Sequence, residues 1–223
     1  MTRSSRQHVL VCFADPSESG ALRKLRPDLR ILHTGMGTGN TSRALHTYLG
    51  TARPDLIVSS GFAGGLRPNL GTGCLVWEPG PHASSVPLTI PSSAKKGSFH
   101  HSSQIVITAS EKDALWKETE RDAVEMESKA IHEIAKREKI PSLTLRIISD
   151  PANEDLPLDF NRTMTPDMRL SYTRLAFQLA KNPSRIFPLI RFGRSVKRTA
   201  RLLADAISEL LPSTRSNSRN SLG

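Results

Sequence analysis

Short apolar runs, each ending at small or polar residues, are the feature that most constrains how this chain can fold. His8–Ala14 (HVLVCFA), Asp55–Ser60 (DLIVSS) and Leu143–Ser149 (LTLRIIS) have the length and composition of buried strands. Helical periodicity occurs between such runs, most clearly over Val124–Lys139. This alternation predicts a largely parallel or mixed sheet that is covered by helices.

Weaker patterns complete the outline. Further strands are expected at Arg30–His33, Gly73–Trp77 and Gln104–Thr108, and further helices at Ala21–Leu25, from Asn40 to near Gly50, and at about Pro166–Lys181 and Ser184–Leu211. The segment Glu78–Ser103 is polar, with four prolines, seven serines and three histidines. Such a long irregular segment is either a functional loop or disordered.

The size and cysteine content indicate a single intracellular domain. A chain of 223 residues with 5% aromatic residues fits one domain whose core is built mainly of Leu, Ile, Val and Ala. Cys12 and Cys74 both lie in predicted strands, and two buried thiols suggest a reducing compartment. The N-terminal apolar run is too short for a signal peptide, and no run approaches the roughly 18 residues of a transmembrane helix. We therefore expect a cytoplasmic protein.

Four polar or glycine-rich turns follow predicted strands, at Asp15–Glu18, Gly35–Gly39, Gly61–Gly65 and Asp150–Asp155. Open α/β sheets hold their ligands at the carboxyl ends of strands, so these four turns could line one pocket. The glycines let a ligand approach the backbone closely, although a tight turn or close helix–strand packing would explain them as well.

Acidic residues supply the candidate chemistry. Asp150 directly follows an apolar strand, where partial desolvation raises the pKa of a carboxyl so that it holds a proton near neutral pH; alternatively, it caps the turn at Pro151. Glu125 and Glu127 lie at the start of a predicted helix, where the macrodipole favours acids. Because they are two residues apart, we expect at most one to face a pocket and the other to be solvated. The histidines lack metal-ligand spacing, so no metal is expected.

Four segments together resemble the purine nucleoside phosphorylase and nucleosidase superfamily. They are Pro54–Leu66 (PDLIVSSGFAGGL), Gly71–Val76 (GTGCLV), Asp122–Ala130 (DAVEMESKA) and Leu145–Asp150 (LRIISD). The resemblance implies an α/β fold, a three-layer αβα sandwich with a mixed central sheet, to which C-terminal helices are added here. It also implies a homo-oligomeric enzyme that needs no cofactor and does not bind nucleic acid.

The methylthioadenosine and adenosylhomocysteine nucleosidases of this superfamily imply a role for each acidic residue. By this resemblance Asp150 protonates the purine N7, Glu18 activates water, and Glu127 holds the ribose 2′- and 3′-hydroxyls. The remaining substrate-binding residues that it implies are Met126, which packs under the sugar, Gly37, Phe62, Ala63 and Gly64. One carboxylic acid and one carboxylate across a glycosidic bond form the arrangement of inverting glycosidases.

The chain departs from the phosphorylases where these bind phosphate. Their basic Gly-Asp-Pro-x-Arg turn is replaced by Ala14–Glu18 (ADPSE), and Phe62 stands where many relatives have a small hydroxyl residue. Both changes remove phosphate ligands and favour hydrolysis over phosphorolysis. The segment that normally supplies base-stacking aromatic residues is shortened between Glu78 and Ser103.

Within the superfamily, the chain is most similar to the hopanoid-associated nucleosidases. Leu175–Pro183 (LAFQLAKNP), Pro188–Arg194 (PLIRFGR) and Ser149–Ala152 (SDPA) carry this similarity. It implies removal of adenine from lipid-linked adenosylhopane, leaving ribosylhopane. The alternatives are a soluble methylthioadenosine/adenosylhomocysteine nucleosidase, a purine nucleoside phosphorylase, or a non-enzymatic membrane- or nucleic-acid-binding protein that relies on the net charge of +10.

We divide the chain into a nucleosidase-like catalytic domain (residues 1–183), a basic amphipathic helix (184–211) and a disordered tail (212–223). Half of the net charge lies between Lys181 and Leu211, where seven cations face two acids. The predicted apolar face of the helix comprises Ile186, Leu189, Ile190, Val196, Ala200, Leu203, Ile207 and Leu210, and the basic face Arg191, Arg194, Arg198 and Arg201. Such a helix either lies on the inner face of a membrane or packs on the sheet with its arginines in solvent.

Overall fold

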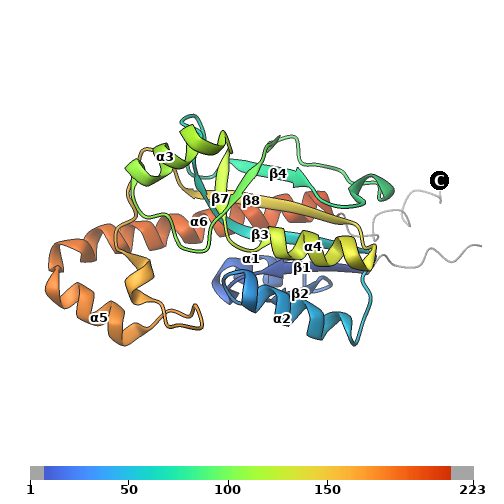
Figure 1. Ribbon diagram of the computed structural model, residues 1–223, viewed down its shortest axis with the longest axis horizontal. Coiled ribbons are helices and arrows are strands. Elements are labelled where there is room, and N and C mark those ends of the chain that lie inside the picture. Colours follow the sequence, from blue (N-terminus) through green and yellow to red (C-terminus); the bar gives the residue numbers. More distant parts are fainter. Residues whose placement is uncertain (1–7, 212–223) are drawn as a thin grey trace, which may run out of the picture.

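A computed structural model describes residues 8–211, which form an eight-stranded sheet between two layers of helices (Figure 1). The strands are β1 (Val9–Phe13), β2 (Arg30–His33), β3 (Leu56–Gly65), β4 (Leu75–Pro79), β5 (Ala94–Lys96), β6 (Phe99–His101), β7 (Ala123–Glu125) and β8 (Ser142–Asp150). The α-helices are α1 (Pro16–Leu25), α2 (Thr38–Leu49), α3 (Ala109–Thr119), α4 (Ser128–Glu138), α5 (Tyr172–Lys181) and α6 (Ile186–Leu210).

The sheet is mixed, as the sequence predicts. Its main path runs β2-β1-β3-β8-β4-β5, and β7 joins β6 to the end of β3. The strands β2, β1, β3 and β8 are parallel, whereas β4 is antiparallel to β8 and β7 is antiparallel to β3. The parallel strands β1, β3 and β8 therefore end at one edge of the sheet, where the glycine-rich and acidic turns follow.

Each face of the sheet is covered by a pair of helices. On one face α2 and α4 pack over Leu10, Cys12 and Ile57, with Ile131 and Ile134 facing the sheet. On the other face α1 and the second half of α6 cover the larger cluster, to which α6 contributes Leu203, Ala204, Ala206, Ile207 and Leu210. The three-layer αβα sandwich is thereby confirmed.

Local sequence signals fix where several helices begin. Asp15 caps α1 in a capping box with Glu18, and Pro16 follows at the first helical position. Thr108 and Glu111 form a second capping box at the start of α3. Gly37 precedes α2 with a φ of 81°, a conformation that favours glycine, and its backbone N–H donates to the side chain of Glu127.

The structure corrects four of the expected elements. Residues 104–108 form no strand; they lead into α3, a helix that periodicity did not predict. The expected helix Val124–Lys139 starts only at Ser128, because residues 123–125 form β7 instead. Strand β3 continues through the glycine-rich motif to Gly65, and the segment between Glu78 and Ser103 contains the short strands β5 and β6.

Helix α6 corresponds to the amphipathic helix expected at residues 184–211, but its two halves differ in burial. Ala200, Leu203, Ile207 and Leu210 are buried on the sheet, whereas Ile186 and Ile190 at the other end of α6 are exposed. The alternative of a helix packed on the sheet therefore describes the second half of α6. Figure 1 shows α5 and the first half of α6 projecting from one end of the sandwich. The tail assigned to residues 212–223 lies outside the described residues.

Two further observations bear on the sequence-based expectations. Cys12 is buried and Cys74 is half-buried, and both are free thiols. Within residues 8–211, no helix combines the length and apolarity needed to cross a bilayer.

Candidate active site

A cavity of about 520 Å³ opens where β1, β3, β7 and β8 end. All four predicted turns contribute to its wall: Glu18 from the first, Met36 from the second, Phe62 from the third and Asp150 from the fourth. The strand topology thus brings together segments that are far apart in the sequence, such as Glu18 and Asp150, which are 132 positions apart.

The cavity is strongly acidic. Five carboxyl groups line it, and no Lys or Arg belongs to its wall among the described residues: the acids are Asp15, Glu18, Glu125, Glu127 and Asp150. Buried carboxylates repel one another, so the site must either hold some of them protonated or neutralise them from behind.

Arg146 on β8 provides this neutralisation from beneath the cavity. Its Nη2 lies 2.5 Å from Oε2 of Glu125 and 3.2 Å from Oε2 of Glu127, and its Nη1 donates to the Ser60 carbonyl at 2.9 Å. The guanidinium is fully buried in the sheet. Sequence analysis missed Arg146, although a single cation inside the apolar run LTLRIIS was a visible signal.

Glu125 and Glu127 are both buried, which corrects the expectation that one of them is solvated. Residues two apart can share a site here because Glu125 ends a strand and Glu127 begins a helix. Glu125 also accepts from the backbone N–H groups of Glu127 and Ser128 and lies 2.5 Å from Nδ1 of His101. Although burial opposes its ionisation, Arg146 and these donors hold the pKa of Glu125 well below its usual range.

Glu127 has the opposite tendency. Burial, together with the neighbouring Glu125 and Glu18 carboxylates, raises its pKa to about 7 in spite of Arg146. Its Oε1 accepts a hydrogen bond of 3.0 Å from the backbone N–H of Gly37. Gly37 itself is not part of the cavity wall, so its role in this structure is to hold Glu127.

Glu18 lies on the first turn of α1 with its carboxylate turned toward β3. Oε1 accepts from the backbone N–H of Phe62 at 2.9 Å, and Oε2 accepts from that of Asp15 at 3.1 Å. Burial raises its pKa, and Arg146 partly offsets this. Gly61 makes the arrangement possible, because a Cβ there would lie 2.5 Å from Arg146 Nη1 and 2.7 Å from Glu18 Oε1.

Asp150, the last residue of β8, is tied down by two side chains. Its Oδ1 accepts from the Ser149 hydroxyl at 2.5 Å, and its Oδ2 lies 2.6 Å from Nζ of Lys112. If Asp150 capped the turn at Pro151, its carboxylate would accept from backbone N–H groups of that turn. Its partners are instead the side chains of Ser149 and Lys112. Burial raises the pKa of Asp150, and the Lys112 ammonium opposes that increase.

Lys112 is the second residue that sequence analysis missed. It lies on α3 with a side chain that is 0% exposed, and its ammonium also donates to the carbonyls of Pro151 and Glu154 at 2.9 and 2.8 Å. Three acceptors therefore use the three ammonium protons. Lys112 fixes both the Asp150 carboxyl and the turn that follows it.

The other wall of the cavity is apolar. Of the substrate-contacting residues expected from sequence, Met126, Phe62, Ala63 and Gly64 line the cavity beside the carboxylates. The apolar wall opposite was not predicted and is formed by Ile105, Val106, Leu156, Phe160, Met164, Leu170, Tyr172, Phe192 and Val196. The cavity can therefore hold a polar group at its acidic floor and an apolar group towards α5 and α6.

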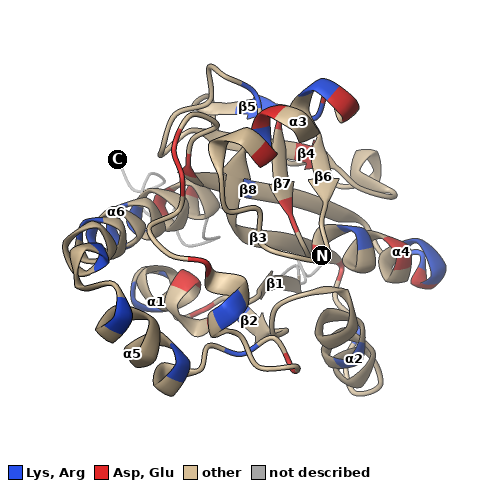
Figure 2. Cartoon of the chain, turned by 60° about the vertical axis from the view of Figure 1, so that its left-hand side comes forward, with Lys and Arg blue, Asp and Glu red and all other residues tan. Residues whose placement is uncertain are grey.

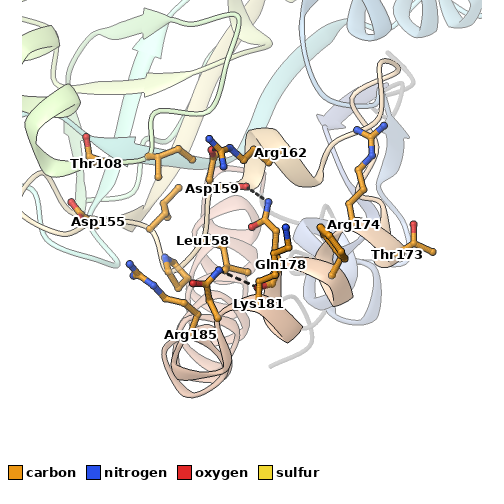
Figure 3. A pocket seen from close by; sticks show the side chains of 15 residues that line it. Thr108, Asp155, Leu158, Asp159, Arg162, Thr173, Arg174, Gln178, Lys181 and Arg185 are labelled. Carbon is orange, nitrogen blue, oxygen red and sulfur yellow. Dashed lines mark hydrogen bonds and ion pairs between the residues drawn. The ribbon is translucent and has the colours of Figure 1, made fainter.

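A second cavity of about 700 Å³ lies beneath α5 (Figure 3). Its wall has mixed charge and includes Arg162, Arg174, Lys181 and Arg185 as well as Asp155 and Asp159. None of the buried carboxylates described above reaches it, so the smaller cavity is the candidate active site. Within residues 8–211, no group of three or more His, Cys, Asp and Glu side chains is arranged to hold a metal ion.

Comparison with known proteins agrees with this description. Residues 21–77 match the family model described as the Phosphorylase superfamily. Futalosine hydrolase of Helicobacter pylori strain 26695 has a similar structure, with a TM-score of 0.62 at 15% identity over 92% of this chain and 97% of that one. No curated protein matches the chain in sequence.

Two nucleosidase structures are similar to the same extent. For the 5′-methylthioadenosine/S-adenosylhomocysteine nucleosidase of Campylobacter jejuni, the TM-score is 0.64 at 14% identity, covering 92% of this chain and 98% of that one. For the Neisseria meningitidis enzyme in complex with methylthio-immucillin-A, the TM-score is 0.62 at 17% identity, covering 91% of this chain and 97% of that one. The matched segment and the shared fold together confirm the resemblance of this chain to the phosphorylase superfamily.

Proposed function

We propose that the protein is a purine nucleosidase, an enzyme that hydrolyses the N-glycosidic bond of an adenine nucleoside. The observation that carries the proposal is the acidic cavity, in which Asp150, Glu18 and Glu127 are buried together at the strand ends. The proteins of similar fold named above are a futalosine hydrolase and two methylthioadenosine/adenosylhomocysteine nucleosidases, which supports this class of reaction.

In the proposed mechanism Asp150 is the general acid. Burial favours its protonated form, and it passes this proton to N7 of the purine as the bond between C1′ and N9 breaks. The bonding electron pair leaves with the base, and positive charge develops on the sugar. The ionised carboxylates of the cavity stabilise that charge electrostatically.

Glu18 and Glu127 complete the reaction on the sugar side. Glu18 accepts a proton from a water molecule as the water oxygen bonds to C1′, so that free base and free sugar are the products. Glu127 accepts hydrogen bonds from the ribose 2′- and 3′-hydroxyls, for which the Gly37 N–H and Arg146 hold its carboxylate in place. Met126, Phe62, Ala63 and Gly64 surround the nucleoside.

Hydrolysis is favoured over phosphorolysis by the charge of the cavity. A phosphate co-substrate needs cationic ligands, and this wall carries five acids with no Lys or Arg among its described residues. The buried guanidinium beneath the cavity, that of Arg146, is already paired with Glu125 and Glu127. Phosphate would therefore be repelled from the position that water occupies in the proposed reaction.

For the substrate itself, we propose lipid-linked adenosylhopane, which would yield ribosylhopane and adenine. The motifs shared with hopanoid-associated nucleosidases and the apolar wall of the cavity support this substrate. The protein would act in the cytoplasm as a homo-oligomer, with peripheral contact to the inner membrane face through its C-terminal helix. A soluble methylthioadenosine or adenosylhomocysteine substrate is the second candidate, supported by the names of the structural neighbours.

Product analysis tests the proposal. Adenosylhopane, methylthioadenosine and inosine are each incubated with the protein, with and without inorganic phosphate, and free base and sugar are quantified. We expect free base (adenine from adenosylhopane and methylthioadenosine, hypoxanthine from inosine) and free sugar at a rate that phosphate does not change, with adenosylhopane as the best substrate. A sugar 1-phosphate as product, or a strict phosphate requirement, would overturn the hydrolytic mechanism.

A further inference from the structure

The segment that carries α5 and the start of α6 exposes most of the large apolar side chains that reach solvent. Six of the eight exposed large hydrophobic residues within residues 8–211 lie here: Leu170, Tyr172, Phe177, Ile186, Phe187 and Ile190, which we call the α5–α6 patch. Tyr172, Phe187 and Phe177 are 77%, 76% and 61% exposed. Helix α5 has no buried residue at all. An apolar surface of this kind marks an interaction site.

The charge of the same segment is entirely of one sign. Residues 168–204 contain no Asp or Glu and nine cations: Arg169, Arg174, Lys181, Arg185, Arg191, Arg194, Lys197, Arg198 and Arg201. Figure 2 shows the basic positions along α5 and α6. In the described part of the chain, none of these nine side chains takes part in an ion pair. The partner that this surface fits is therefore anionic as well as apolar.

The apolar and basic residues of α6 share its outer face. Phe187, Arg191, Arg194, Arg198 and Arg201 recur at intervals of three and four, so they lie on one side of the helix. The buried residues of its second half lie on the side that packs against the sheet. The outer face is consequently apolar in its first turns and basic beyond them, a composition typical of helices that lie in a membrane interface.

The α5–α6 patch also adjoins the candidate active site. Leu170 and Tyr172 belong to the patch and line the 520 Å³ cavity, where Phe192 and Val196 of α6 join them. Apolar surface thus continues from the exposed helices to the cavity. A nucleoside that is attached to a lipid could enter this way while its apolar part stays among lipid chains, whose transfer to water is unfavourable.

We infer that the α5–α6 patch docks the protein on an anionic lipid bilayer, with its aromatic and aliphatic side chains in the interface and its cations on the headgroups. The inference deepens the lipid-linked substrate of the proposed function, but membrane docking is measured without any turnover. It differs from the helix face expected from sequence, because Ala200, Leu203, Ile207 and Leu210 are used in the core.

Vesicle co-sedimentation tests the inference. The full chain is mixed with phosphatidylcholine vesicles, with or without phosphatidylglycerol, at low and high salt. We expect binding that requires the anionic lipid and is released by salt, since screening weakens the attraction. In the variant Phe187→Ser/Ile190→Ser the bound fraction should fall at least about tenfold, because two inserting side chains are lost.

Matched variants separate the patch from a general effect. Leu25→Ser removes an exposed leucine outside the patch and should bind as wild type. Arg191→Gln/Arg194→Gln should weaken binding to anionic vesicles, whereas Lys136→Gln/Arg137→Gln on α4 should not. Neither Phe187 nor Ile190 lines the cavity, so hydrolysis of a water-soluble nucleoside should be unchanged in that variant.

Three results would overturn the inference. The first is absence of binding to anionic vesicles at low salt, and the second is equal binding by wild type and Phe187→Ser/Ile190→Ser. The third is that the wild type is an oligomer and this variant is a monomer, which would show that the patch is an interface between copies of the chain. Failure of the proposed catalytic function would be seen separately, as absence of base release from a water-soluble nucleoside whether or not the protein binds vesicles.

Discussion

Replacing Glu127 with glutamine should stabilise the folded protein increasingly as the pH rises from about 5 to 8. In the wild type, the folded state holds the Glu127 proton up to a pKa of about 7, whereas the ordinary value is 4.5. As the pH rises through this window, the unfolded chain releases the proton first, so ionisation favours unfolding. The stabilisation that protonated Glu127 contributes is therefore fully present below pH 4.5 and is lost as the pH rises towards 7. Glutamine does not titrate, so the variant does not lose this stabilisation.

The size of the effect follows from the difference between the two pKa values. At about 1.4 kcal/mol for each pH unit, it corresponds to about 3 kcal/mol of unfolding free energy. The variant also changes the contacts with Arg146 and Gly37, so the absolute stability difference at any one pH contains further contributions. The predicted quantity is therefore the growth of the stability difference between variant and wild type across the pH range.

Urea unfolding of both proteins at intervals from pH 5 to 8.5 measures this growth. Glu125→Gln is the matched control, because Arg146 holds the pKa of Glu125 low and its carboxylate contributes stability that is present at neutral pH. That variant should be less stable than wild type at pH 7. A stability difference for Glu127→Gln that stays constant with pH would refute the assignment of the retained proton to Glu127.

Two substitutions probe the other carboxyl groups. Lys112→Met removes the cation beside Asp150, so the pKa of Asp150 should rise and the alkaline limb of the pH profile of kcat/KM should move upward by about one pH unit. An unchanged alkaline limb would show that Lys112 does not influence the pKa of the general acid. Gly61→Ala places a Cβ 2.5 Å from Arg146 Nη1 at a φ of 141°, so it should cost about 1–3 kcal/mol of stability and lower kcat, as measured by thermal unfolding and rate assays. Gly71→Ala is the control, because a Cβ at Gly71 meets no atom within 4 Å, and it should change neither quantity.

The sheet and its turns were predictable because their signals are local. Runs such as VLVCF (Val9–Phe13) contain no charged or strongly polar residue that would face solvent, so they specify buried strands without reference to the rest of the chain. The four turns that meet in the cavity follow from the rule that parallel strands end at one edge. Asp150 could be singled out in this way, since it stands at the end of such a strand, whereas Glu18 lies five positions after β1 and was indicated by the family resemblance.

The elements that sequence analysis missed depend on contacts between distant residues. Strand β7 has three residues and exists because it pairs with β3 and β6, so the helical periodicity that begins at Val124 was misleading there. Helix α3 has little amphipathic pattern, and its best signal was the capping box Thr108–Glu111. Without α3 in place, the contact between Lys112 and Asp150, 38 positions later, could not be foreseen.

The buried ionic network was hidden for a related reason. Glu125, Glu127 and Arg146 are each costly to bury alone, and only their mutual contact makes the arrangement stable. If both glutamates lay on one helix, their spacing of two residues would place them on different faces. In the structure Glu125 ends a strand and the helix begins only at Ser128, so both side chains turn toward Arg146. The exposed aromatic residues of α5 likewise carried no sequence signal that distinguished them from core residues.

The central claim is that Asp150 is the general acid that protonates the departing purine base. The most direct test is the rate at which the Asp150→Asn variant releases the base from its substrate. The substitution keeps the shape of the side chain but removes the proton that N7 receives, so turnover of an adenine nucleoside in phosphate-free buffer should fall by about a hundredfold or more. Circular dichroism and unfolding would verify that the variant is folded. A folded Asp150→Asn protein that releases adenine at nearly the wild-type rate would contradict the account.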